Sequence, residues 1–277
     1  MHVEKQIPDN ELPIAIFDSG VGGLSVVRAL RELLPRENLL YFADTAHLPY
    51  GEKSPNTILQ CVKKSLAIVQ RYRPKMLLIA CNTAWIVAHK EIRSSFSIPV
   101  ISISEQGIAS LSETETIAIL GTRATITSGY FQKEISMRIP KALLFPIACP
   151  LFVLLVEFGL MEHEMTASIA RSYLLQLQKQ RIDQVLLACS HFPFLNPILQ
   201  QTIGENARLI DPAWECAQET YRTLLHVHLM NPQQQPGMLR CFVTKNPKAF
   251  QATGKQLLND PHLSAFLYME EKYPSLH

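Results

Sequence analysis

Two cysteines follow closely similar segments of this chain. Leu77 to Cys81 and Val185 to Cys189 are apolar runs typical of buried strands, and two hydrogen-bonding side chains follow each cysteine. These polar pairs are Asn82-Thr83 and Ser190-His191. Two facing thiols could remove a proton from one side of a carbon atom and return a proton to the other side. The repeated context favours a pair of acid–base cysteines over two inert buried ones.

Three ionisable side chains could assist these thiols. Asp18 ends an apolar strand before a glycine-rich turn, where it could help a thiol transfer protons or cap the helix that follows. His191 lies two residues after Cys189, so an acid–base role is at least as well supported as a structural one. Glu157 lies within an apolar run, where it either contacts a polar site or occupies a helix surface.

A flexible turn and several uncharged donors suggest a substrate site. The turn from Gly20 to Gly23 is not a full dinucleotide fingerprint, because Ser25 replaces the last glycine. It suits a small anion such as a carboxylate better, and Ser19 could contact that ligand. Neutral donors can hold both carboxylates and the amine of a small amino acid. They are Asn82, Thr83, Ser190, Thr122 and Thr125.

Strand and helix patterns alternate along the chain. We expect strands at 13–17, 39–43, 76–80, 99–103, 116–120, 142–148 and 184–188, and helices at 24–34, 55–71, 84–93, 124–135 and 165–178. This alternation predicts right-handed crossovers and parallel sheets. In such sheets, ligands bind at the carboxyl ends of the strands. Five polar clusters fall at these ends: Asp18-Ser19, Asp44-Thr45, Cys81-Asn82-Thr83, Gly121-Thr122 and Cys189-Ser190-His191.

The order of elements predicts an α/β protein of two similar domains. Each domain would have a parallel-sheet core, and the site would lie in the cleft between them. We expect residues 1–103 with 211–277 to form the first domain and residues 104–210 to form the second. The tail from Ala213 carries helical patterns and a polar loop at 231–236. We expect this tail to pack back on the first half.

Composition excludes several classes of function. The 277 residues carry a net charge of +2, and Lys and Arg are scattered, so no footprint for nucleic acid is present. The longest apolar stretch, 142–158, is interrupted by two prolines and Glu157 and is too short to span a bilayer. The first six residues contain no signal-peptide core. The six cysteines include no CxxC pair, which fits reduced thiols in the cytoplasm.

Metal and serine-hydrolase chemistry are not predicted. The nine histidines form no H-E-x-x-H or H-x-x-E-H pattern, and His226 and His228 lack a third-ligand signal. No G-x-S-x-G segment is present. We therefore expect no metal site. We expect the remaining cysteines to be small buried hydrophobes, namely Cys61, Cys149, Cys216 and Cys241.

Taken together, these segments strongly resemble the glutamate racemase family. The shared segments follow one another in family order across most of the chain. They are Asp18 to Gly23, Asp44 to Ala46 with Pro49 to Gly51, Cys81 to Ala84, Gly121-Thr122 with Thr125, Cys149 to Val153 with Val156-Glu157, and Cys189 to Pro193.

The resemblance implies a cofactor-independent proton transfer that interconverts L- and D-glutamate and supplies D-glutamate for peptidoglycan. Cys81 and Cys189 would be the two acid–base thiols. Asp18 would assist Cys81, whereas His191 and Glu157 would assist Cys189. The resemblance implies glutamate as the small-molecule partner, with no nucleic-acid or membrane partner, and it is compatible with a homodimer. The substrate-binding residues would be Asp18, Ser19, Tyr50, Gly51, Asn82, Thr83, Thr122, Thr125, Ser190 and His191.

The sequence departs from the family at a few positions but keeps every expected catalytic group. Ser190 and Phe192 replace the usual Thr and Tyr, and Ala43 stands where Gly is common. Trp85 replaces a small residue and could reshape packing behind the pocket, and Glu105-Gln106-Gly107 departs from a common Pro-Gly form near the domain crossing. Two alternatives stay open. One is a racemase of aspartate or another small acidic amino acid, and the other is a binding homologue without turnover.

Overall fold

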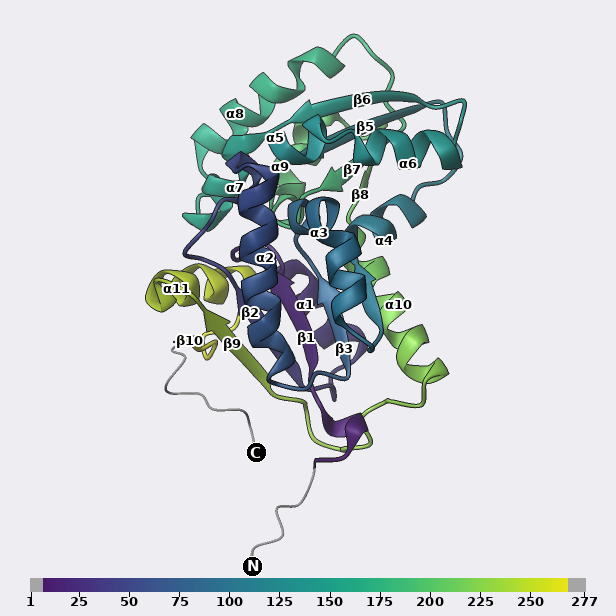
Figure 1. Cartoon of the computed structure of the whole chain (residues 1–277). Coiled ribbons are helices and arrows are strands. Elements are labelled where there is room, and N and C mark those ends of the chain that lie inside the picture. Colours follow the sequence, from purple (N-terminus) through teal and green to yellow (C-terminus); the bar gives the residue numbers. More distant parts are fainter. Residues whose placement is uncertain (1–6, 269–277) are drawn as a thin grey trace, which may run out of the picture.

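The strands form two separate sheets, in which every neighbouring pair is parallel. Figure 1 shows the computed structural model, which describes residues 7–268. Sheet A has the order β10-β9-β2-β1-β3-β4, and sheet B has the order β6-β5-β7-β8. Sheet A contains β1 (Ile14–Asp18), β2 (Leu39–Ala43), β3 (Met76–Ile79), β4 (Val100–Ser102), β9 (Leu239–Val243) and β10 (Ala265–Leu267). Sheet B contains β5 (Thr116–Gly121), β6 (Leu143–Ala148), β7 (Gln184–Ala188) and β8 (Arg208–Ile210). The predicted α/β class with two parallel-sheet cores is confirmed.

Helices cover both faces of each sheet. On sheet A, α1, α10 and α11 pack on one face, and α2 and α3 pack on the other. On sheet B, α4 and α6 cover one face, and α7, α8 and α9 cover the other. The helices are α1 (Leu24–Leu33), α2 (Pro55–Gln70), α3 (Asn82–Ser95), α4 (Ile103–Ala109), α5 (Arg123–Thr127), α6 (Tyr130–Arg138), α7 (Pro150–Glu157), α8 (Glu164–Leu174), α9 (Asn196–Ile203), α10 (Pro212–His226) and α11 (Pro247–Leu258). Short 3₁₀ segments lie at Asp9–Glu11, Tyr50–Glu52, Leu175–Leu177 and Phe192–Leu195.

The central strands are apolar throughout because both of their faces are buried. Ile14 and Ile16 of β1 belong to the same buried cluster as Leu30 of α1. Ala15 and Phe17 point the other way and belong to the cluster that holds α2 and α3. Successive strand residues point to opposite faces, so a strand covered on both sides is a continuous apolar run.

The tail returns to the first half, as predicted. Strand β9 pairs in parallel with β2, with Leu239 opposite Leu39, and β10 pairs with β9 at the edge of sheet A. The sequence analysis missed both strands. Residues 231–236 form no helix or strand, in agreement with the predicted loop. The strands of sheet A come from residues 14–102 and 239–267, and those of sheet B come from residues 116–210. The division into residues 1–103 with 211–277 and residues 104–210 stays a prediction.

Several predicted helix boundaries were wrong. The helix expected at 124–135 is two helices, α5 and α6, because Gly129 between them has a left-handed backbone with φ of 69°. The helix expected at 165–178 ends as an α-helix at Leu174 and tightens into a 3₁₀ turn. The helix expected from residue 84 begins at Asn82, directly after Cys81.

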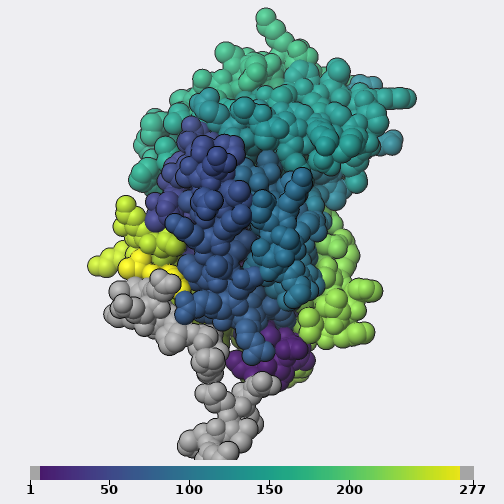
Figure 2. Space-filling view, viewed as in Figure 1, coloured from purple at the N-terminus to yellow at the C-terminus, as the bar shows by residue number. Residues whose placement is uncertain are grey.

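The two halves of the molecule are in extensive contact. Figure 2 shows the teal segment meeting the dark blue and blue segments along a broad boundary. One buried cluster includes Leu24 and Val27 from α1 as well as Leu187 from β7. Among residues 7–268, none of the helices combines the length and hydropathy needed to cross a bilayer.

Candidate active site

Both cysteine loops line one cavity between the carboxyl ends of the two sheets. Strands β1 and β3 of sheet A and β5 and β7 of sheet B end at this cavity. Its volume is about 20 Å³. The lining residues are Ser19, Pro49, Tyr50, Gly51, Cys81, Asn82, Thr83, Thr122, Val153, Cys189, Ser190 and His191. Most of the predicted site residues are therefore brought together, whereas the sequence analysis missed Pro49 and Val153.

Cys81 is held at the junction between β3 and α3. Its sulfur caps α3 by accepting a hydrogen bond from the amide of Ala84, with an N···S distance of 3.5 Å. Its thiol donates to the hydroxyl of Ser19 at 3.8 Å. Burial, reinforced by the negative charge of Asp18, raises the pKa of the Cys81 thiol. These surroundings favour the neutral thiol of Cys81 over the thiolate.

Asp18 lies directly behind Ser19 and does not line the cavity. Its Oδ1 accepts a hydrogen bond from the amide of Gly20 at 2.9 Å, and its Oδ2 has no hydrogen-bond partner among residues 7–268. Burial raises its pKa, although the nearby His191 and the Gly20 amide oppose that shift. Asp18 does not cap α1, whose N-cap residue is Gly23. The predicted capping alternative is therefore wrong, and the carboxylate instead orders the turn.

Cys189 is joined to His191 and Glu157 in a short chain of contacts. The Cys189 sulfur lies 3.8 Å from Nδ1 of His191, and Nε2 of His191 lies 2.6 Å from Oε1 of Glu157. Burial by itself would lower the pKa of His191, but its contacts with Cys189 and Glu157 outweigh burial and hold that pKa well above the ordinary value. His191 therefore places a positive charge next to the Cys189 sulfur.

Glu157 connects the two halves of the site. It is the last residue of α7, and its Oε1 also accepts a hydrogen bond from the amide of Val21 at 2.9 Å. Its backbone carbonyl accepts from the hydroxyl of Thr253 in α11 at 3.0 Å. The side chain is only 13% exposed. The alternative of a helix-surface glutamate is therefore wrong, because the carboxylate is paired inside the molecule.

Three threonine hydroxyls meet where α3 and α5 begin. Thr83 Oγ1 lies 3.1 Å from Thr122 Oγ1 and 3.2 Å from Thr125 Oγ1, and the last two are 3.0 Å apart. Thr83 and Thr122 line the cavity, but Thr125 is fully buried behind them and does not. Thr125 can therefore orient the other two hydroxyls, and the expected direct contact with substrate is not supported by its position.

Asn82 presents an amide that is only half satisfied. Its Oδ1 accepts a hydrogen bond from the hydroxyl of Ser104 at 2.7 Å. Its Nδ2 is buried and has no partner among residues 7–268. A buried donor without a partner is costly, so a ligand that offers an acceptor would be favoured here. Ser104 was not predicted, and only its contact with Asn82 reveals its role.

Tyr50 is anchored from behind by Asp44. The Tyr50 hydroxyl donates to Oδ2 of Asp44 at 2.7 Å, and the hydroxyl of Thr244, next to β9, donates to Oδ1 at 2.9 Å. The returning tail therefore supports a residue that lines the cavity. This network was not predicted because Thr244 is distant in the sequence and has no motif.

Glycines at the turns allow the two halves to approach closely. A Cβ atom at Gly22 would overlap the side chains of His191 and Ser190. A Cβ atom at Gly51 would overlap Thr122. Both glycines belong to segments of sheet A, and the atoms that they meet belong to segments of sheet B. Any larger residue would separate the two groups of site residues.

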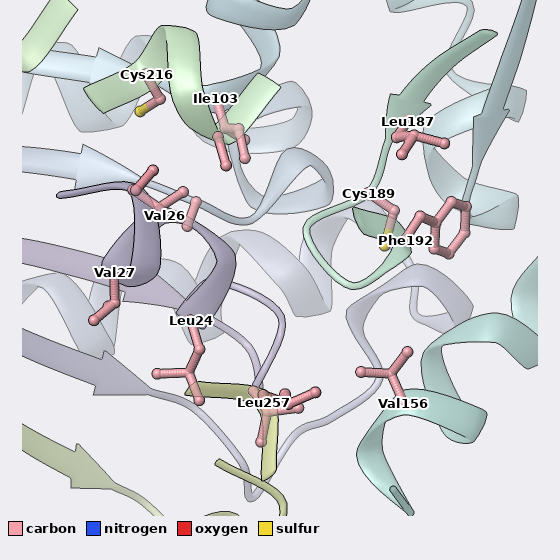
Figure 3. Packing of buried hydrophobic residues seen from close by; sticks show 14 of the residues in the cluster. Leu24, Val26, Val27, Ile103, Val156, Leu187, Cys189, Phe192, Cys216 and Leu257 are labelled. Atoms are coloured by element: carbon pink, nitrogen blue, oxygen red, sulfur yellow. The ribbon is translucent and has the colours of Figure 1, made fainter. Parts of the chain in front are cut away.

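Three of the family departures lie outside the cavity lining. Phe192 packs edge to face on Phe152, with ring centroids 5.3 Å apart, and Figure 3 shows it beside Cys189. Trp85 is fully buried and outside the cavity lining, and its indole N–H donates to the hydroxyl of Tyr130 at 3.3 Å. Glu105 forms an exposed ion pair with Arg93 at 2.8 Å. None of these residues displaces a predicted acid–base group.

Comparisons with known proteins agree on one family. The family model described as Asp/Glu/hydantoin racemase matches residues 22–220. The glutamate racemase of Syntrophus aciditrophicus is 40% identical over 249 residues, covering 89% of this chain and 92% of that protein. The crystal structure of Francisella tularensis glutamate racemase in complex with D-glutamate matches with a TM-score of 0.88 and 29% identity, covering 95% of this chain and all of that one. The Thermus thermophilus glutamate racemase, solved with β-chloro-D-alanine, matches with a TM-score of 0.84 and 33% identity, over 96% of this chain and 100% of the other.

Proposed function

This chain belongs to the Asp/Glu/hydantoin racemase family, and we propose that it interconverts L- and D-glutamate by proton transfer between Cys81 and Cys189. The observation that carries this proposal is the pair of thiols, which line one cavity from two different sheets. The relatives of known structure support glutamate as substrate, because one of them was solved with D-glutamate. No cofactor is needed for the transfer that follows.

The proposed chemistry uses the two sulfurs on opposite faces of the substrate α-carbon. The thiolate of one cysteine takes the α-proton, and the thiol of the other gives its proton to the opposite face. The reaction ends with the thiolate and the thiol exchanged, so the reverse reaction starts from the other enantiomer. The carbanionic charge requires fixed donors around the carboxylate and exclusion of water.

The surroundings of the two sulfurs suggest how they are charged before reaction. The positive charge of a protonated His191 would lie next to the Cys189 sulfur, and the raised pKa of Cys81 supports a neutral thiol there. One base and one acid would then be ready at the same time. Asp18 would assist Cys81 through Ser19 and the Gly20 turn, and Glu157 would keep His191 protonated.

Neutral donors would bind the carboxylates and the amine of glutamate. The unpartnered Nδ2 of Asn82 is the strongest candidate for a carboxylate contact. The remaining lining groups offer hydroxyls and backbone amides. They are Ser19, Tyr50, Gly51, Thr83, Thr122, Ser190 and His191. Asp18 and Thr125 would act from behind them.

The cellular role follows from the same resemblance. We propose that the product D-glutamate is supplied for peptidoglycan and that the enzyme works in the cytoplasm. All six cysteines carry free thiols, which suits a reducing compartment.

Racemisation with α-proton exchange in deuterated water tests the proposal. Cys81→Ser and Cys189→Ser should each reduce racemisation by about 10²–10⁴-fold or more, because each removes an acid–base group. Cys216→Ser is the matched control, since this buried cysteine lies in α10 outside the cavity. Full activity in either of the first two variants would rule out the two-thiol mechanism.

Substrate comparison separates the alternatives. A higher kcat/KM for aspartate than for glutamate would make this chain a racemase of the smaller acid. Glutamate binding without solvent exchange into the α-position would instead indicate a binding homologue.

A further inference from the structure

Three potential metal ligands lie together behind Tyr50, outside the cavity. Asp44 follows β2, His47 lies in the turn after it, and Cys61 belongs to α2. Each offers one ligand atom, and these atoms all lie within 4.8 Å of one another. A tetrahedral zinc site with bonds of about 2.0–2.3 Å has ligand atoms about 3.3–3.8 Å apart. At most about 1 Å of closure is therefore needed to bring the widest-spaced atoms to that separation.

The carboxylate of Asp44 already has the neighbours that a metal-binding carboxylate requires. Nδ1 of His47 lies 2.9 Å from both carboxylate oxygens, so the position between ring and carboxylate can hold an ion in place of a proton. The hydroxyls of Tyr50 and Thr244 donate to the same carboxylate from other directions. They would orient it as outer-shell partners while a metal is bound.

The cluster is open to solvent on one side only. The His47 side chain is 49% exposed, whereas the Asp44 side chain is 3% exposed and Cys61 is 6% exposed. An ion can therefore reach the cluster past His47, and a water molecule can take the fourth position. Lys53 and Lys64 act on Cys61 from nearby, and their positive charges partly offset the attraction of Asp44 for a cation.

We propose that Asp44, His47 and Cys61 form a site for a divalent cation of the zinc or cobalt class. The mixture of sulfur, nitrogen and oxygen ligands matches the preference of these ions. On binding, bonds form from the metal to Sγ, Nδ1 and one carboxylate oxygen. The thiol proton of Cys61 leaves to solvent, and so does the proton that Nδ1 of His47 shares with Asp44, while Nε2 carries the N–H of the neutral ring.

The proposed site would act on the structure that supports Tyr50. A bound ion ties the turn that carries Asp44 and His47 to α2 while the Tyr50 hydrogen bond is kept. Binding to the folded state alone stabilises the protein against unfolding. The proposed metal site differs from the expectation, drawn from the sequence, that the chain has no metal site. The three ligands come from separate positions with no ligand spacing, so a motif search does not find them.

Cobalt absorption spectroscopy tests the site independently of racemase activity. The test uses a Cys81→Ser, Cys189→Ser background, which removes the two thiols of the cavity. Titration with Co²⁺ should produce thiolate-to-cobalt charge-transfer absorption that saturates near one equivalent. Adding Cys61→Ser should abolish this absorption, and His47→Gln should weaken Co²⁺ binding at least about tenfold. Adding Cys216→Ser instead should leave the charge-transfer absorption and the affinity for Co²⁺ unchanged.

Two further measurements keep the result decisive. Circular dichroism identifies variants that fail to fold, and Cys61→Ala provides a second replacement in that case. Zn²⁺ should raise the Tm of the background protein but not that of the His47→Gln variant. The proposal is overturned if the folded background protein shows no charge-transfer absorption, or if that absorption persists after Cys61 is replaced.

Discussion

The two cysteines share a backbone setting but differ in the residues that support them. Cys81 caps a helix and has a neutral hydroxyl and a buried carboxylate nearby. Cys189 has an imidazole in contact, which is itself paired with Glu157. The two thiols therefore have different charged neighbours, although the proposed reaction requires that they exchange roles in each cycle.

Removing the Glu157 carboxylate should shift the pH dependence of the reaction. Glu157→Gln takes away a charge that raises the pKa of His191, so the alkaline limb of the kcat/KM profile should move to lower pH. We expect kcat/KM to fall about tenfold, which corresponds to about 1.4 kcal/mol. The fall must be equal in both directions because the two enantiomers have equal free energy. Glu164→Gln at the exposed start of α8 is the control, and an unchanged alkaline limb in Glu157→Gln would contradict this role.

His191 should also make the stability of the protein depend on pH. Its folded pKa lies above its unfolded value of about 6.5, so the folded state binds the proton more tightly. The resulting stabilisation is fully present below about pH 6.5 and is lost as the pH rises through the folded pKa. Urea unfolding across this pH range measures the free energy of unfolding of the wild type and of His191→Asn. The difference between the two free energies should shrink as the pH rises. A constant difference between the two proteins would refute this linkage.

At the scale of elements, short turns at strand ends determine where the functional groups lie. The turn after β1 contains glycines that leave room for His191 and Ser190, and α3 starts immediately after β3 with Cys81 as its cap. Both arrangements place backbone amides and side chains at the carboxyl ends of strands. The turns thus contribute as much to the site as the motif side chains do.

Adding one methyl group to the turn after β1 should impair catalysis. The Cβ atom in Gly22→Ala would overlap His191 and Ser190, which displaces the Cys189 loop. A displacement of about 1 Å costs on the order of 10²-fold in rate. Gly107→Ala is the control, because its Cβ would approach the flexible end of Leu186 no closer than 3.2 Å. Steady-state kinetics measures the loss of catalytic rate, and Tm measures any loss of stability. A fully active Gly22→Ala variant would show that the turn adjusts freely.

At the scale of the whole molecule, the site exists only where two sheets meet. Its cavity of about 20 Å³ holds about one water molecule, which is far less than an amino acid needs. We therefore expect the two halves to separate when substrate enters. Contacts that cross the site include Glu157 with Val21 and the hydroxyl of Ser25 with the carbonyl of Ser190.

A reversible covalent link across the mouth should stop this separation. Glu52 and Arg123 approach to 3.4 Å from opposite halves and are exposed. A bis-methanethiosulfonate cross-linker should join the cysteines of a Glu52→Cys, Arg123→Cys variant and reduce racemisation at least about tenfold, and a reducing agent should restore it. The two single variants control for modification of Cys81 and Cys189. Full activity of the verified cross-linked form would show that opening is unnecessary.

The sequence determined the strand ends and the chemistry that they carry. Cys81, Cys189 and His191 could be predicted because their apolar strands and polar followers are local patterns, and the family resemblance added Tyr50 and Gly51. The parallel sheets were also predictable, since alternating strands and helices permit few other arrangements.

Only the tertiary structure decided which residues support the site from a distance. The links from Thr244 to Asp44, from Ser104 to Asn82 and from Glu157 to Val21 join segments that have no shared local pattern. The strands β9 and β10 were missed for the same reason, because pairing at a sheet edge depends on the neighbouring strand. The local sequence determines which side chains lie at the end of a strand. The packing of the two sheets determines which residues those side chains contact.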